Sequence, residues 1–180
     1  MIGKKRKAAL EYFQKNAAGE YIYTGGTYTY RTEKISREKA LLILWALGIV
    51  SPGGLLAGGC MLVPGLGSSL YVMGPYVVGI ISAFCALWSV GQLTLGGEPI
   101  REYVYESASG KLRIRLWLTM IFSGLSFLGE GLYLILNGAG GHGVQALVYL
   151  ILCAAALGAS LLGLRVFRSL SWEKIQPESP

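Results

Sequence analysis

The sequence is poor in charge, in acidic residues and in histidine. Only 14% of its 180 residues are charged, with 10 acidic residues and one His, whereas a soluble domain has about 25% charged residues. The 53% share of apolar residues excludes a disordered chain. Three Cys, an odd and low number, exclude a disulfide scaffold. The remaining class is a small integral membrane protein.

Four long stretches carry almost no charge. They run from about Ala40 to Val63, from Met73 to Leu95, from Leu116 to Leu136 and from Val144 to Leu164. A helix needs about 20 apolar residues to cross a bilayer, so each stretch is long enough to cross once. Short Gly-rich turns join the first pair and the last pair. The predicted fold class is therefore all-α integral membrane, a four-transmembrane-helix bundle of two helical hairpins with short cytoplasmic β-hairpins.

The positive charges predict the orientation. All 16 Lys and Arg lie before the first apolar stretch, between the second and third, or after the fourth, and the two short turns have none. Lys and Arg near helix ends stay in the cytoplasm, so both termini and the middle loop are expected there, and topology accounts for the net charge of +6 without a nucleic-acid partner. We expect a multi-pass protein of a bacterial cytoplasmic membrane. The expected segments are a cytoplasmic 1–39, a helical hairpin 40–96, a cytoplasmic loop 97–115, a second helical hairpin 116–164 and a cytoplasmic tail 165–180.

The cytoplasmic segments contain three local patterns. Residues 4–16 have apolar side chains at helical spacing beside a basic cluster, which predicts a short amphipathic helix, either bound to anionic lipid or simply solvated. Residues 20–33 alternate aromatic and β-branched residues around Gly25 and Gly26, and this pattern predicts a β-hairpin. A second hairpin is expected in 102–115. Because residues 20–23 (EYIY) match 102–105 (EYVY), a repeat of hairpin plus two helices is one hypothesis, and chance similarity is the other.

Glu130 is the acidic residue that falls inside an apolar stretch. If the third helix begins at Leu116, Glu130 lies roughly 21 Å into it, where a carboxylate is costly unless it faces protein or water. Its neighbours Gly129 and Gly131 would allow close approach of a ligand or another backbone. The functional interpretation is a proton, cation or cationic-substrate site. The alternative is a structural carboxyl that is hydrogen-bonded to a neighbouring helix.

The first apolar stretch contains Pro52, Gly53 and Gly54 near its middle. A proline removes one helical hydrogen bond and the glycines ease unwinding, so this segment is a candidate for a broken helix. In transporters, broken helices at matching positions of two halves form the midplane binding site, and aligning Ala40 with Leu116 places Gly53 and Gly54 opposite Gly129 and Glu130. A simple proline kink is the alternative.

Small residues recur at spacings that favour close helix packing. The candidate packing residues are Gly54, Gly58, Gly79, Ala83, Ala155, Ala159 and Gly163. They predict contacts within the bundle, or contacts of a homo- or hetero-oligomer with another membrane protein.

The sequence contains no recognisable catalytic or cofactor motif. Cys60, Cys85 and Cys153 form no C-x-x-C pair, and His142 stands without a carboxylate cluster. No metal, cofactor or nucleic acid is therefore expected, and the expected partners are the lipid bilayer and a membrane protein. The favoured function is a non-enzymatic, membrane-embedded accessory or assembly subunit that binds another protein. The alternative is a small proton- or cation-coupled transporter that uses Glu130.

Overall fold

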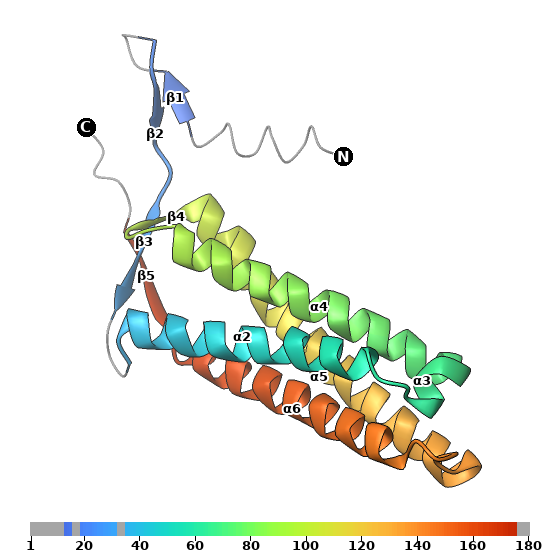
Figure 1. Ribbon diagram of the computed structural model, residues 1–180. Helices are drawn as coiled ribbons and strands as arrows, with labels where there is room; N and C mark the ends of the chain where they lie inside the picture. The colour runs from blue at the N-terminus through green and yellow to red at the C-terminus, as the bar shows by residue number, and fades with distance from the viewer. Residues whose placement is uncertain (1–12, 16–18, 32–34, 176–180) are drawn as a thin grey trace.

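The computed structural model of the chain describes residues 13–15, 19–31 and 35–175. Four long helices lie side by side in one elongated bundle, with the strands gathered at one end (Figure 1). We call this end the sheet end. The opposite end, where the short helix α3 lies, is called the α3 end. The helices are α2 (Arg37–Gly59), α3 (Pro64–Ser68), α4 (Leu70–Leu95), α5 (Glu102–Asn137) and α6 (Gly143–Arg168).

The four long helices agree with the predicted helical bundle. Each has an apolar window long enough to cross a membrane, and together they fit a multi-pass membrane protein. The helices form a ring, in which α4 packs against α2 and α5, and α6 packs against α2 and α5. The sheet-end core contains Leu44, Leu93 and Leu112. The core nearer α3 contains Leu55 and Tyr149.

Cross-helix contacts show which residues lie at the same level of the bundle. Trp45 of α2 donates a hydrogen bond to Thr94 of α4. Arg115 of α5 donates to the Cys85 carbonyl of α4 (2.8 Å) and to Ser89. Trp45, Trp88 and Trp117 therefore lie within a narrow band, as tryptophans do at a membrane interface. From Trp117 to the end of α5 at Asn137 is about 30 Å, which is the thickness of a bilayer core.

The strands form two small sheets. In one, β1 (Phe13–Lys15) pairs with β2 (Tyr21–Tyr23). In the other, β3 (Thr27–Arg31) lies between β4 (Ile100–Arg101) and β5 (Ser171–Ile175), antiparallel to both. The second sheet packs on α5 through aromatic rings, with Tyr28 stacked on Tyr105 at 4.1 Å and Trp172 at 5.4 Å from Tyr105.

The predicted hairpin in 20–33 is wrong in its pairing. The residues do form strands, but β2 pairs with β1 and β3 pairs with β4 and β5. The reason lies at Gly26, whose N–H and carbonyl are both bonded to Glu102 at the start of α5. The Gly-Gly segment therefore connects two different sheets instead of turning the chain back.

The predicted hairpin in 102–115 is also wrong, because these residues form the first turns of α5. Ala108, Leu112 and Leu116 recur every four residues, and all three are buried. Residues four apart lie one above the other on a helix, so α5 buries these three side chains as one continuous apolar face. The matching residues are thus a strand at 21–23 and a helix at 102–105, so the expected repeat of hairpin plus two helices is not found.

The predicted amphipathic helix in 4–16 falls mostly outside the described residues. Its described part, Phe13–Lys15, is a strand. The segment 165–180, predicted as a cytoplasmic tail, continues α6 up to Arg168 and then forms β5 at Ser171–Ile175.

Of the two interpretations of Pro52, the broken helix is not supported, because α2 is continuous through this residue. A proline costs one backbone hydrogen bond, which membrane helices tolerate.

Candidate functional site

Glu130 is completely buried inside the bundle. One carboxylate oxygen, Oε1, accepts a hydrogen bond from the backbone N–H of Gly65 in α3 (3.2 Å). The other, Oε2, has no hydrogen-bond partner among the described residues. Glu130 lies about 20 Å from Trp117 along α5 and about 10 Å from Asn137. The carboxylate therefore lies about 5 Å from the middle of the predicted span, on the side of the α3 end.

The neighbours of Glu130 confirm close backbone approach on one side only. A Cβ on Gly129 would lie 3.3 Å from the Tyr71 carbonyl, so this glycine admits the backbone of α4. Gly131 faces open space, with no atom within 4 Å of such a Cβ. A Cβ on Gly65 would overlap Glu130 Oε2 and lie 2.9 Å from the Tyr133 ring. Gly65 and Gly129 thus fit the elements around the carboxylate.

The buried face of α5 is polar from Thr119 to Glu130. Thr119, Ser123, Ser126 and Glu130 follow one another at intervals of four, three and four residues, and each is at most 1% exposed. The Ser126 hydroxyl lies 2.5 Å from the hydroxyl of Tyr149 on α6. The Ser123 hydroxyl is buried without a partner among the described residues. These groups form a file of polar side chains that ends at Glu130.

The structure does not join Glu130 to the segment Pro52, Gly53 and Gly54. A Cβ on Gly54 would lie 3.6 Å from the Leu152 carbonyl of α6, and Gly53 faces open space. Gly58, one turn further along α2, contacts Tyr149, which is level with Ser126. Pro52 and its glycines are therefore about two turns, roughly 12 Å, closer to the sheet end than Glu130 is.

Most of the predicted packing residues lie between helices. A Cβ on Gly58 would lie 3.0 Å from the Tyr149 ring, one on Gly79 3.6 Å from Phe122, and one on Gly163 3.4 Å from Leu116. The buried members of the set also include Ala83 and Ala159. Ala155 differs, because it is exposed on the outside of α6. The next residue, Ala156, faces the inside of the bundle and is completely buried.

The three cysteines are free, and only Cys153 is buried. Within the described ranges, no three His, Cys, Asp or Glu residues lie together in a way that could hold a metal ion. His142 immediately precedes α6 at the α3 end.

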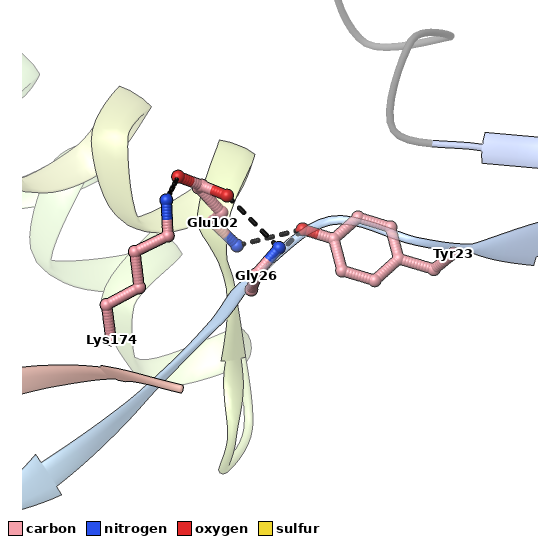
Figure 2. Close-up of polar contacts among 4 residues, drawn as sticks. All are labelled: Tyr23, Gly26, Glu102 and Lys174. Carbon is pink, nitrogen blue, oxygen red and sulfur yellow. Dashed lines mark hydrogen bonds and ion pairs between the residues drawn. The ribbon is translucent and has the colours of Figure 1, made fainter. Parts of the chain in front are cut away.

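A second buried carboxylate, not expected from the sequence, lies at the other end of α5. Glu102 is 8% exposed and is the first residue of the helix. Figure 2 shows its carboxylate between Gly26 and Lys174. It accepts a hydrogen bond from Gly26 N–H (3.1 Å) and forms an ion pair with Lys174. Its own backbone N–H donates to the Gly26 carbonyl and to the Tyr23 hydroxyl, both at 3.0 Å.

We call Tyr23, Gly26, Glu102 and Lys174 the Glu102 cluster. It connects the segment between β2 and β3 with β5 and with the start of α5, which are far apart in the sequence. The Lys174 ammonium holds the pKa of Glu102 below its ordinary value against the opposing effect of burial, and the Gly26 N–H adds to this lowering. The Glu102 carboxylate in turn raises the pKa of Lys174. An acidic residue in the first turn of a helix is a recognisable sequence signal. It was not used here, because residues 102–115 were predicted to be a hairpin and not a helix.

No protein-family model, curated protein or solved structure matches this chain.

Gly65→Ala tests the contact between α3 and Glu130. The added methyl group would overlap the carboxylate, so we expect the free energy of unfolding to fall by about 1–3 kcal/mol, as for other overpacked sites. The matched control is Gly67→Ala in the same short helix, because a Cβ there meets no atom within 4 Å. Denaturant titration in mild detergent measures both variants. Equal stability of the two would contradict the described contact.

The Glu102 cluster predicts a dependence of stability on pH. Because the folded pKa of Glu102 is lowered, its contribution is complete above the ordinary carboxyl pKa of about 4.3 and is lost as the pH falls through the lowered value. Because the folded pKa of Lys174 is raised, the contribution is also lost as the pH rises above about 10.4 through the raised value. Melting temperatures of the wild type and Glu102→Gln should therefore differ most between these limits and converge in acid. Glu38→Gln, at an exposed position of α2 away from the cluster, is the control and should keep a melting temperature close to that of the wild type throughout this range.

Proposed function

We propose that this chain is a non-enzymatic accessory or assembly subunit of a bacterial cytoplasmic membrane that binds another protein with its sheet end. In this proposal both termini are cytoplasmic. The absence of Lys and Arg from the two turns at the α3 end supports this orientation.

The observation that carries the proposal is the free edge of β5. In the three-stranded sheet, β5 pairs with β3 on one side and with no described strand on the other. An unpaired edge presents backbone N–H and C=O groups to a further strand, which is a common mode of protein recognition. The outward side chains Ser171, Glu173 and Ile175 are exposed. They are therefore available to a partner.

The attachment of this edge to the membrane helices supports the same proposal. Trp172 and Lys174 of β5 point toward α5, where they meet Tyr105 and Glu102. A protein bound to the outer edge of β5 would therefore be held at a fixed position relative to the bundle. Such an arrangement suits a subunit that positions a partner at the membrane surface.

Site-specific photocrosslinking in native membranes tests the proposal. A photoreactive residue at Glu173 should capture one protein of defined mass, and the same residue at Leu136, exposed at the α3 end, should not capture it. Ile175→Asp should abolish co-purification of that protein, because it adds a charge to the proposed contact surface. The melting temperature should stay unchanged, since Ile175 is half exposed. Capture from both positions, or retention of the partner by Ile175→Asp, would contradict the proposal.

A second candidate function is proton- or cation-coupled transport that uses Glu130. The observation that favours it is the buried oxygen Oε2, which has no described partner and stands at the end of the polar file on α5. In proteoliposomes containing a pH-sensitive dye, a transporter should move protons under a potassium diffusion potential, and Glu130→Gln should remove this flux. Ser82→Ala, a buried polar position on α4 outside the file, is the control. Flux equal to that of protein-free vesicles would leave Glu130 with a structural role.

A further inference from the structure

The outer surface of α5 contains a depression near the sheet end. It measures about 540 Å³ and is lined by Gly110, Arg113, Ile114, Trp117 and Leu118. These residues follow one another at intervals of three, one, three and one, so they form a single strip along the helix. Gly110 contributes no side chain, and a Cβ there would meet no atom within 4 Å. The depression is therefore open at Gly110, on the side of the sheet end.

Arg113 is the charged residue of this depression. It is exposed and forms no ion pair with any residue that the structure describes. The acidic residue before it on α5 is Glu106, seven residues or about 10 Å away along the helix axis. No carboxylate lines the depression. Its net charge is therefore positive.

The position of the depression corresponds to a membrane surface. Trp117 lies one turn from Arg113 and belongs to the tryptophan band described above. Beyond it, toward the α3 end, the same outer surface becomes apolar, with Leu118, Ile121 and Leu125 between 37% and 46% exposed. A cation, an indole ring and an apolar strip thus follow one another from the surface into the membrane region.

We propose that this depression binds the headgroup of one anionic phospholipid. The Arg113 guanidinium would donate hydrogen bonds to the phosphodiester, because its planar fork matches phosphate oxygens. The glycerol backbone would lie in the space left open by Gly110, and one acyl chain would follow Ile114 and Leu118. Because the lining has no carboxylate to receive a choline or ethanolamine group, the site favours a headgroup with net negative charge. This inference rests on the proposed membrane location of the helices.

Native mass spectrometry of the full-length protein in mild detergent tests the proposal. The protein is titrated with dioleoylphosphatidylglycerol and, separately, with dioleoylphosphatidylcholine. We expect preferential binding of the phosphatidylglycerol. Arg113→Gln should weaken it by about fivefold, the effect of one surface cation on an anionic lipid, and should leave phosphatidylcholine binding unchanged. Arg165→Gln is the matched control, because Arg165 is exposed on α6 at nearly the same level and outside the depression.

A second variant separates shape from charge. Gly110→Leu keeps every charge, favours the helix and fills the open part of the depression, so it should reduce the lipid preference as Arg113→Gln does. Two results would overturn the proposal: an equal loss of phosphatidylglycerol binding in Arg113→Gln and Arg165→Gln, or an unchanged preference for phosphatidylglycerol in Gly110→Leu. Either result would indicate a general attraction between cations and anionic lipid. Flotation of the wild-type protein with pure phosphatidylcholine vesicles tests the membrane location separately. If the wild-type protein did not float with these vesicles, the proposed membrane location of the helices would be refuted.

Discussion

The arrangement of the sheet end depends on one buried carboxylate, that of Glu102. Its side chain accepts from Gly26 and pairs with Lys174, so a single residue holds β3 and β5 against the start of α5. A Cβ at position 26 would lie 2.8 Å from Lys174 Cε and 2.9 Å from Glu102 Oε2, so a larger residue here would displace the ends of these two side chains. Removing one partner of the Glu102 carboxylate would leave a buried polar group without a hydrogen bond. The resulting loss of stability is larger than the net stabilisation that the bond provides.

The α3 end repeats this arrangement with a different carboxylate. Glu130 accepts from the N–H of Gly65 in α3, just as Glu102 accepts from the N–H of Gly26. Both acids belong to α5, and both hold a glycine-containing segment that a side chain would push away. In water such hydrogen bonds would compete with solvent, but at a buried position the backbone N–H has few other acceptors. The longest helix of the protein thus uses an acid near each end to fasten the chain segments that lie against it.

The sequence predicted the four helices well and the strand pairing poorly, for a physical reason. A bilayer-length apolar run can satisfy its backbone only as a helix, so local composition is sufficient to find it. The central strand β3 instead pairs with Arg101 and Ile175, residues that are distant in the chain, and no local pattern encodes such partners. Glu130 was identifiable because a carboxylate is rare in an apolar run. Its partner was missed, although Pro64 before Gly65 was a signal for a helix start.

One continuous helix, α5, joins the sheet end of the bundle to the α3 end. Its 36 residues run without interruption from Glu102 in the sheet to Asn137 beyond Glu130. This helix contains no proline, although its two Ser-Gly pairs, Ser109–Gly110 and Ser123–Gly124, are positions where a helix can kink. The sheet contact, the polar file and the Glu130 contact with α3 therefore lie along one continuous helix. By contrast, α2 and α4 each contain a proline, Pro52 and Pro75, and each therefore lacks one helical hydrogen bond. Both carboxylate contacts thus belong to a helix whose backbone hydrogen bonding no proline interrupts.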